Sequence, residues 1–279
     1  MASITVQKAN FWKRISAWLL DFILLTIVAT GFAAAVSAFS GYDGVYTTYS
    51  AKIESYYETY ESKYGIELDI DEEEYNALSP DQQATFNAVA EELTNALAND
   101  KETQALYQML YNLTLIITAV SLFFSCLILH FIIPLFFGYG QTLGKKIFGL
   151  AVMRTNCVKA TNPVLFIRAM IGLYAMETMV PVFVILMIYF GMLGLAGTVV
   201  LLLLLALEIG VMISSKTNSS IHDLLTDTVV IDFASQEIFD TEEDLLARKQ
   251  QLHEEEVSHS EYDRIQLPSS ANGEGAEEQ

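Results

Sequence analysis

The apolar residues of this chain gather into four long runs that polar sequence separates. Each run is almost free of charged residues: Ile15–Phe39, Leu106–Phe137, Ala169–Phe190 and Leu193–Ile213. A hydrocarbon core of roughly 30 Å needs about 20 helical residues, so every run is long enough to span a bilayer. Soluble helices carry a polar stripe, and Thr198–Leu207 has none. The pattern predicts an all-α, polytopic membrane helix bundle with about four transmembrane helices.

The polar segment between the first two runs, Gly41–Ala105, has helical periodicity of its own. Large side chains recur there at steps of three and four, which places them on one face of a helix. They are Tyr42, Tyr46, Tyr49, Ile53, Tyr56, Tyr60 and Tyr64. A second helix is expected to start after Ser79, because Ser79 and Gln82 form a capping box and Pro80 suits the first helical position. Its apolar face is Phe86, Val89, Leu93 and Leu97. We expect a helical hairpin in which the tyrosine face packs on the second helix, with a tyrosine-lined ligand surface as the alternative.

Two acidic stretches are interpreted as solvated sequence. Asp69–Tyr75 (DIDEEEY) lacks the glycine and the spacing of a calcium-binding loop, so we expect an acidic loop without a metal. The sequence after Asp232 contains one helical segment near Glu242–Glu256. It ends in PSSANGEGAEEQ (268–279), whose composition is typical of disorder.

These features divide the chain into eight expected parts. They are the N-terminus with the first span (1–40), the extracytoplasmic insert (41–105), the second span (106–137), a basic loop with the start of an interfacial helix (138–168), the third span (169–190), the fourth span (191–213), a His-Asp block (214–232) and an acidic, partly disordered tail (233–279).

The net charge of −19 is unevenly distributed and predicts the orientation in the membrane. Gly41–Ala105 holds fifteen acidic and three basic residues, and Asp232–Gln279 holds fourteen acidic and three basic residues. The remaining basic residues are Lys8, Lys13, Arg14, Lys145, Lys146, Arg154, Lys159, Arg168 and Lys216. They lie before the first span, between the second and third, or just after the fourth. The positive-inside rule therefore places both termini in the cytoplasm of a cell and the insert outside its membrane. No basic patch indicates nucleic-acid binding.

The first span also has some features of a cleaved signal peptide. Lys13 and Arg14 precede its apolar run, and Ala33–Ala38 resembles a cleavage site. However, the run exceeds the usual apolar core of about 7–15 residues and contains Asp21. An uncleaved span is the favoured interpretation.

Three sequence blocks in the same order resemble the RDD family of bacterial membrane proteins. KRISAWLLDF contains Arg14 and Asp21, and GQTLGKKIFGLAV (140–152) is similar to the loop that follows the second span of the family. Pro163 followed by Arg168 matches the pattern before the third span, and IHDLLTDTVVID (221–232) is similar to the closing block. The residues that match are Arg14, Asp21, Gly140, Thr142, Gly144, Lys145, Arg168, His222, Asp223 and Thr228. The resemblance covers residues 8–39 and 106–232. The resemblance implies the four-span topology. It also implies a transport activity, and cation/proton exchange is one activity suggested for the family.

Four ionisable residues lie within the predicted spans: Asp21, His130, Glu177 and Glu208. Such groups cost about 2.5–3.5 kcal/mol each on insertion scales and by default suggest function. At 1.5 Å per residue, each lies about 9–13 Å from the cytoplasmic end of its helix, so the four together could form one polar site. Crowded carboxylates can exchange a proton for a cation, and a histidine with three carboxylates could hold a divalent metal. The alternatives are an Arg14–Asp21 pair on one helix face, pairing of Glu177 and Glu208 with Arg168 and Lys216, and a packing role for His130.

Two function classes remain open from the sequence. The first is a small transporter or exporter that uses Asp21, Glu177 and Glu208, with Arg14 as an electrostatic partner. The second is a non-transporting scaffold or regulatory component that acts through the insert and the tail on another protein. No catalytic motif accompanies His222 and Asp223, so we expect no enzyme and no cofactor, and we interpret Asp223, Thr226 and Thr228 as a latch between helix ends. Because four spans make a thin bundle, a transporter of this size is expected to form a homo-oligomer in the lipid bilayer.

Overall fold

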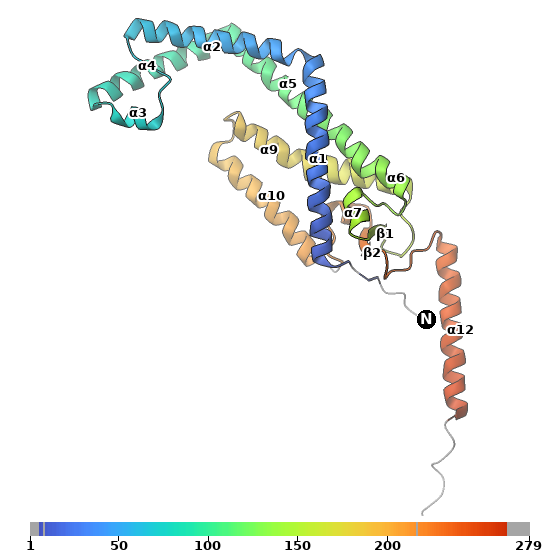
Figure 1. Ribbon diagram of the computed structural model, residues 1–279. Coiled ribbons are helices and arrows are strands. Elements are labelled where there is room, and N and C mark those ends of the chain that lie inside the picture. Colours follow the sequence, from blue (N-terminus) through green and yellow to red (C-terminus); the bar gives the residue numbers. More distant parts are fainter. Residues whose placement is uncertain (1–5, 8, 216, 267–279) are drawn as a thin grey trace, which may run out of the picture. The chain divides into compact units, whose positions relative to one another are not determined.

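The computed structural model describes residues 6–7, 9–215 and 217–266 (Figure 1). Within these residues, four helices are long and apolar enough to cross a membrane. They are α1 (Phe11–Ser40), the composite helices Lys101–Phe137 and Asn162–Tyr189, and α10 (Gly194–Ser214). The four spans and the all-α helical bundle predicted from hydrophobicity are confirmed. Lys8, Lys216 and the C-terminal residues 268–279, on which the sequence also makes predictions, lie outside the described residues.

The second and third spans each contain a π-helical segment. The second consists of α5 (Lys101–Cys126), η1 (Leu127–Ile132) and α6 (Ile133–Phe137). The third consists of α8 (Asn162–Ile167), η2 (Arg168–Met179) and α9 (Val180–Tyr189). The helix of the third span is thus continuous from Asn162, through the part for which an interfacial start is predicted. Wide π turns often accompany functional sites, and these two carry His130, Arg168 and Glu177.

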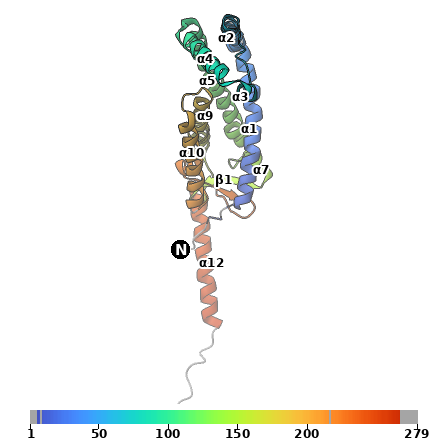
Figure 2. The ribbon, with the colours of Figure 1, turned by 90° about the vertical axis from the view of Figure 1, so that its left-hand side faces the viewer.

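The insert folds as a small helical assembly. It comprises α2 (Tyr42–Tyr64), α3 (Glu72–Ala77) and α4 (Pro80–Asn99), with α2 lying against both α4 and α5 (Figure 2). The capping box of Ser79 and Gln82 and the proline at the helix start are present as predicted. Leu68, Val89 and Leu93 form a buried cluster, against which Tyr56, Tyr57, Tyr60, Ile66, Phe86 and Leu97 pack.

Only part of the tyrosine face packs in the predicted way. Tyr56 and Tyr60 lie on the apolar face of α4, but Tyr49 lies against Tyr107 of α5, with 6.3 Å between ring centroids. Tyr42 and Tyr46 stack on each other, and Tyr46 is exposed. The helix of the second span begins at Lys101, before the predicted start at Leu106. The hairpin prediction missed this extension, which gives α2 a second packing partner.

The acidic stretch Asp69–Tyr75 is not entirely a loop, which corrects the prediction. Its second half enters α3, where the Asp71 side chain accepts from the Glu74 backbone N–H and the Glu74 side chain accepts from the Asp71 backbone N–H. Carboxylates in the first turn of a helix are stabilised by its dipole, so this acidic run is a helix start.

The sequence did not predict a two-stranded antiparallel sheet. The strands β1 (Leu150–Arg154) and β2 (Thr228–Asp232) pair in the register Val152↔Val230. They come from the second and third of the blocks singled out in the sequence. The short helices α7 (Leu143–Ile147) and α11 (Ile221–Leu225) precede β1 and β2 respectively.

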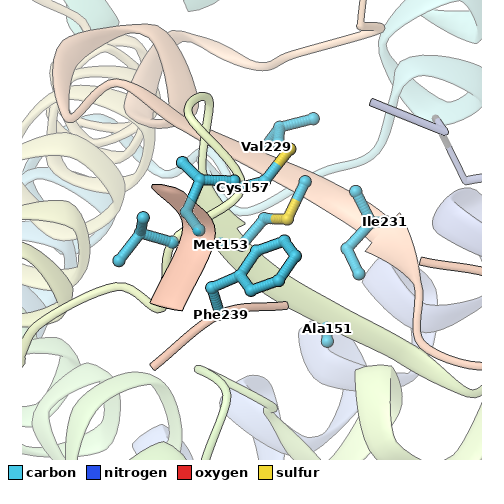
Figure 3. Close-up of a cluster of buried hydrophobic side chains, with 8 residues drawn as sticks. Ala151, Met153, Cys157, Val229, Ile231 and Phe239 are labelled. Carbon is cyan, nitrogen blue, oxygen red and sulfur yellow. The ribbon is translucent and has the colours of Figure 1, made fainter. Parts of the chain in front are cut away.

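Both faces of this sheet are buried. Ala151, Met153, Val229 and Ile231 lie on one face in a cluster with Cys157 and Phe239 (Figure 3). The other face contributes Leu150, Val152 and Val230 to a second cluster. The last helix, α12 (Glu242–Gln266), extends beyond the predicted Glu242–Glu256 and packs Leu245 into the first cluster.

The chain forms two compact units, each of which is contributed by several segments. Unit 1 contains Met1–Ile23, Leu127–Glu177 and Leu204–Gln279. Unit 2 contains Leu24–Cys126 and Thr178–Leu203, and therefore the insert. All of the candidate site residues identified from the sequence belong to unit 1.

Candidate functional site

Unit 1 places three acidic centres near the ends of its helices. One is Asp21 on α1, the second is Asp223 on α11, and the third is the pair Glu177 and Glu208 on η2 and α10. Each centre has a different set of partners. These partners determine how firmly each carboxyl group is held in place.

The Asp21 carboxylate is held by the loop and the short helix that follow the second span. Thr142 Oγ1 donates to Asp21 Oδ2 at 2.5 Å, and the Gly144 backbone N–H donates to Asp21 Oδ1 at 2.8 Å. Lys145 Nζ lies 3.9 Å from Asp21 Oδ2. Burial lowers the pKa of Lys145 to about 8, although the neighbouring Asp21 charge opposes the shift. Both carboxylate oxygens of Asp21 are therefore occupied by donors.

Glycines make this contact between loop and helix possible. A Cβ atom on Gly144 would lie 2.3 Å from the Ala17 carbonyl oxygen and 2.9 Å from the Asp21 carboxyl carbon. Gly140 has a φ of +60°, and a Cβ there would lie 2.9 Å from Leu165 Cδ2. Side chains at these two positions would push the loop away from α1 and from α8.

Asp223 joins α1 to the third span through two arginines. Arg14 Nη2 donates to Asp223 Oδ2 at 3.0 Å, and Arg168 donates to Oδ1 from Nε at 3.1 Å and from Nη2 at 2.7 Å. The Asp223 side chain is 0% exposed. Burial alone would raise the pKa of Asp223, but Arg168, His222 and Arg14 together lower it well below its ordinary value. Ser220 Oγ adds a further donor at 3.0 Å.

The threonines of the same block support Asp223 from its own side. Thr228 Oγ1 donates to the Asp223 carbonyl oxygen at 3.4 Å and lies 3.0 Å from Thr226 Oγ1. These threonine contacts lie within the closing block itself, whereas the contacts to other helices come from Asp223.

The third centre is a pair of carboxyl groups inside two apolar helices. The Glu177 and Glu208 side chains interact electrostatically with each other. Glu177 also contacts His222 twice, because its Oε1 accepts from the His222 backbone N–H at 2.6 Å and its Oε2 lies 2.6 Å from Nδ1. On the other side of the ring, His222 Nε2 lies 2.8 Å from Arg168 Nη2.

A glycine again permits the close approach. Gly172 of η2 lies directly against His222, where a Cβ atom would be 2.4 Å from the His222 Cβ. One π-helical segment, η2, thus contacts α11 at three places. The contacts are made by the Arg168 side chain, the backbone at Gly172 and the Glu177 side chain.

The structure brings together only part of the predicted four-residue cluster. Glu177 and Glu208 meet, whereas the partners described for Asp21 are Thr142, Gly144 and Lys145. His130 has no hydrogen bond or ion pair to other described residues, but it interacts electrostatically with Lys145, Arg168 and His222. Among the described residues, no group of three or more His, Cys, Asp or Glu side chains could hold a metal ion.

The alternative pairings of Arg14 with Asp21 and of Arg168 with a glutamate are wrong, and the alternative that involves Lys216 lies outside the described residues. Arg14 contacts Asp223 and the Thr217 carbonyl oxygen, and it makes no ion pair with Asp21 in the described structure. Arg168 pairs with Asp223, and Glu177 pairs with His222. Residues seven positions apart on a helix are about 10 Å apart along its axis, so each reaches a different neighbour.

Sequence reasoning missed the contact of His222 with Glu177. The resemblance to the family had singled out His222 as a residue of the closing block. The spacing of residues along the chain, however, does not indicate that this histidine contacts the third span.

Comparison with known proteins identifies the family of the chain. The model of the RDD family matches residues 8–227, which include the first two sequence blocks and the beginning of the third. No curated protein and no solved structure matches the chain. Because the match spans most of the chain, the protein belongs to the RDD family.

Proposed function

We propose that this RDD-family protein is a small membrane transporter that exchanges cations for protons, and that the Glu177–Glu208 pair carries the proton. The observation that supports this proposal is the position of two interacting carboxyl groups within apolar membrane-spanning helices, one of which, Glu177, contacts His222. Two ionised carboxylates that lie close together in an apolar environment repel each other, which favours the binding of a proton or a cation by the pair.

The exchange follows from charge balance in an apolar setting. Loss of the bound proton leaves two negative charges close together within helices of low polarity, which is unfavourable unless a cation takes its place. Rebinding of a proton removes one charge and weakens the hold on the cation. The pair can therefore bind a cation and a proton in alternation.

Asp21 and Asp223 have supporting roles in this proposal. Fixed donors occupy their oxygens, and Asp223 is paired with two arginines. A buried carboxylate of this kind stabilises a particular arrangement of helices, and its loss leaves its cationic partners uncompensated. We place the sheet and both termini in the cytoplasm, and we expect a homo-oligomer because four spans make a thin bundle for a transport pathway.

The test is ion-driven proton movement in proteoliposomes that contain the purified protein. Addition of sodium, potassium or a divalent cation is expected to change the internal pH in wild-type vesicles. Glu208→Gln is expected to abolish the signal, because the amide cannot release a proton. Glu243→Gln, at an exposed position of α12, is the matched control and should leave it unchanged.

Two outcomes contradict the proposal. One is a wild-type signal that persists in Glu208→Gln. The other is folded wild-type protein that moves no protons with any of these ions. The second outcome would direct attention to the insert as a surface for an extracytoplasmic partner.

A further inference from the structure

The second span ends in a surface that combines exposed apolar side chains with an exposed lysine. The short helices α6 and α7 lie against each other there. Phe136 of α6 is 84% exposed, and Ile147 of α7 is 67% exposed. Lys146 is exposed between them in the sequence, and its Nζ lies 3.8 Å from the centroid of the Phe137 ring. We call these four residues the α6–α7 surface.

The charge of Lys146 is not neutralised within the described part of the chain. The preceding residue, Lys145, has a side chain that is only 14% exposed and lies 3.9 Å from Asp21 Oδ2. Lys146 makes no ion pair with a described residue, and its printed partner is the neutral face of Phe137. An ammonium group has three donors, so contact with one ring leaves donors free for an anion outside the chain.

The contacts of α7 with the first span place this surface close to the boundary of the membrane. The Gly144 N–H donates to Asp21, and Gly144 also lies against the Ala17 carbonyl oxygen. These two residues of α1 lie about 3–9 Å along the helix axis from Ile15, where the apolar run begins. A lysine at this depth directs its ammonium group toward the lipid headgroups, while its stem lies against apolar groups.

Lipid accounts for both the apolar and the charged part of the surface. Phe136 and its neighbour Leu135 belong to the second span, so their exposed side chains continue the surface that faces the acyl chains. The lone ammonium group complements a phosphate group that carries a net negative charge. A zwitterionic headgroup brings a cation of its own, whereas an anionic headgroup does not, and anionic lipids attract basic residues close to the membrane surface.

We propose that the α6–α7 surface binds one anionic phospholipid, with Lys146 donating to the lipid phosphate and with Phe136 and Ile147 in contact with the acyl chains. Phe137 holds the ammonium group in place from the side of the protein. This binding site is separate from the carboxyl groups invoked for ion exchange.

The test measures which lipids remain bound to the full-length protein. The purified protein is equilibrated in mixed micelles that contain equal amounts of phosphatidylglycerol and phosphatidylcholine with identical acyl chains. It is then recovered on an affinity resin, and the bound lipids are extracted and quantified by mass spectrometry. The readout is the ratio of bound phosphatidylglycerol to bound phosphatidylcholine, which does not depend on transport.

Wild type is expected to favour phosphatidylglycerol, and Lys146→Gln should lower the ratio about fivefold, the effect of one lysine near an anionic surface. Lys146→Arg keeps the charge and should retain the preference. Lys159→Gln is the matched control, because Lys159 also lies over an aromatic ring but is paired with Asp240 at 3.6 Å. Its ratio should equal that of wild type.

Three results overturn the proposal. Equal ratios for wild type and Lys146→Gln would show that this lysine does not select the lipid, and an equal loss in Lys159→Gln would show a general effect of charge. Displacement of phosphatidylglycerol by inorganic phosphate at the same concentration would identify a site for free phosphate instead. Wild type alone provides a further check, because 1 M salt should abolish the preference by screening the contact between ammonium and phosphate.

Discussion

Gly144 illustrates how single residues set the distance between elements of unit 1. Its N–H reaches Asp21 because no side chain separates the loop from α1. Thr142 caps α7 by accepting from the Lys145 backbone N–H, and the same hydroxyl donates to Asp21. The conformation of this short segment therefore depends on one buried carboxylate and one glycine.

Gly144→Ala is expected to destabilise the protein by about 1–3 kcal/mol, the usual cost of overpacking a close contact. The Cβ would meet the backbone carbonyl of Ala17, which cannot move without shifting α1. Gly210→Ala in α10 is the matched control, because its Cβ would have nothing within 4 Å. Thermal unfolding in detergent measures both variants. Equal unfolding temperatures for the two would contradict the packing argument.

For single residues, the sequence indicated which side chains belong to a candidate site. It was less informative about which groups these side chains contact. The cost of ionisable groups in apolar runs singled out Glu177 and Glu208, and the structure brings them together. The partner of Arg14 could not be deduced, because Asp223 is distant in sequence and no local periodicity connects them. Asp21 was assigned to the titrating group because spacing gives depth in a helix but does not show the donors of a loop.

Among the elements, the spans were predictable and the strands were not. Length and hydrophobicity suffice for a transmembrane helix, because the bilayer imposes the requirement. A strand that is buried on both faces shows no alternation of apolar and polar residues, and a short apolar run is ambiguous between helix and strand. Leu150–Arg154 and Thr228–Asp232 have this character, and their pairing partners are far apart along the chain.

The register of the sheet can be tested by disulfide formation. Val152 and Val230 are paired directly, so the double variant Val152→Cys, Val230→Cys is expected to form an intramolecular disulfide upon mild oxidation. The offset pair Val152→Cys, Val229→Cys is the control, and both double variants also carry Cys157→Ser, because Val229 and Cys157 belong to the same cluster. Its second cysteine lies on the opposite face of the sheet and should not react. Counting free thiols in the unfolded protein gives the result, and efficient reaction of the offset pair would show a different register.

For the whole molecule, the division into two units separates the candidate site from the insert. The acidic centres and the sheet belong to unit 1, and the tyrosine-rich helices belong to unit 2. Charge distribution predicts that the insert is outside the cell and that the sheet and α12 are inside. The apolar lengths of the helices do not by themselves determine this orientation.

Thiol labelling in cells can determine the orientation. Ala84 of α4 and Ser258 of α12 are exposed, whereas the native Cys126 and Cys157 are buried. A membrane-impermeant maleimide is expected to label Ala84→Cys in intact cells. It should label Ser258→Cys only after the membrane has been permeabilised. The reverse pattern would place the insert in the cytoplasm and refute the predicted topology.

The ion pairs of Asp223 also have a consequence for the order in which the protein is made. Asp223 follows Arg14 by 209 positions and Arg168 by 55 positions. During synthesis, the two guanidinium groups are therefore present well before the carboxylate that neutralises both of them. A nascent chain that has not yet reached its last block still lacks this anion. Asp223 thus completes the ion pairs that join α1 to the third span only after all four spans have been synthesised.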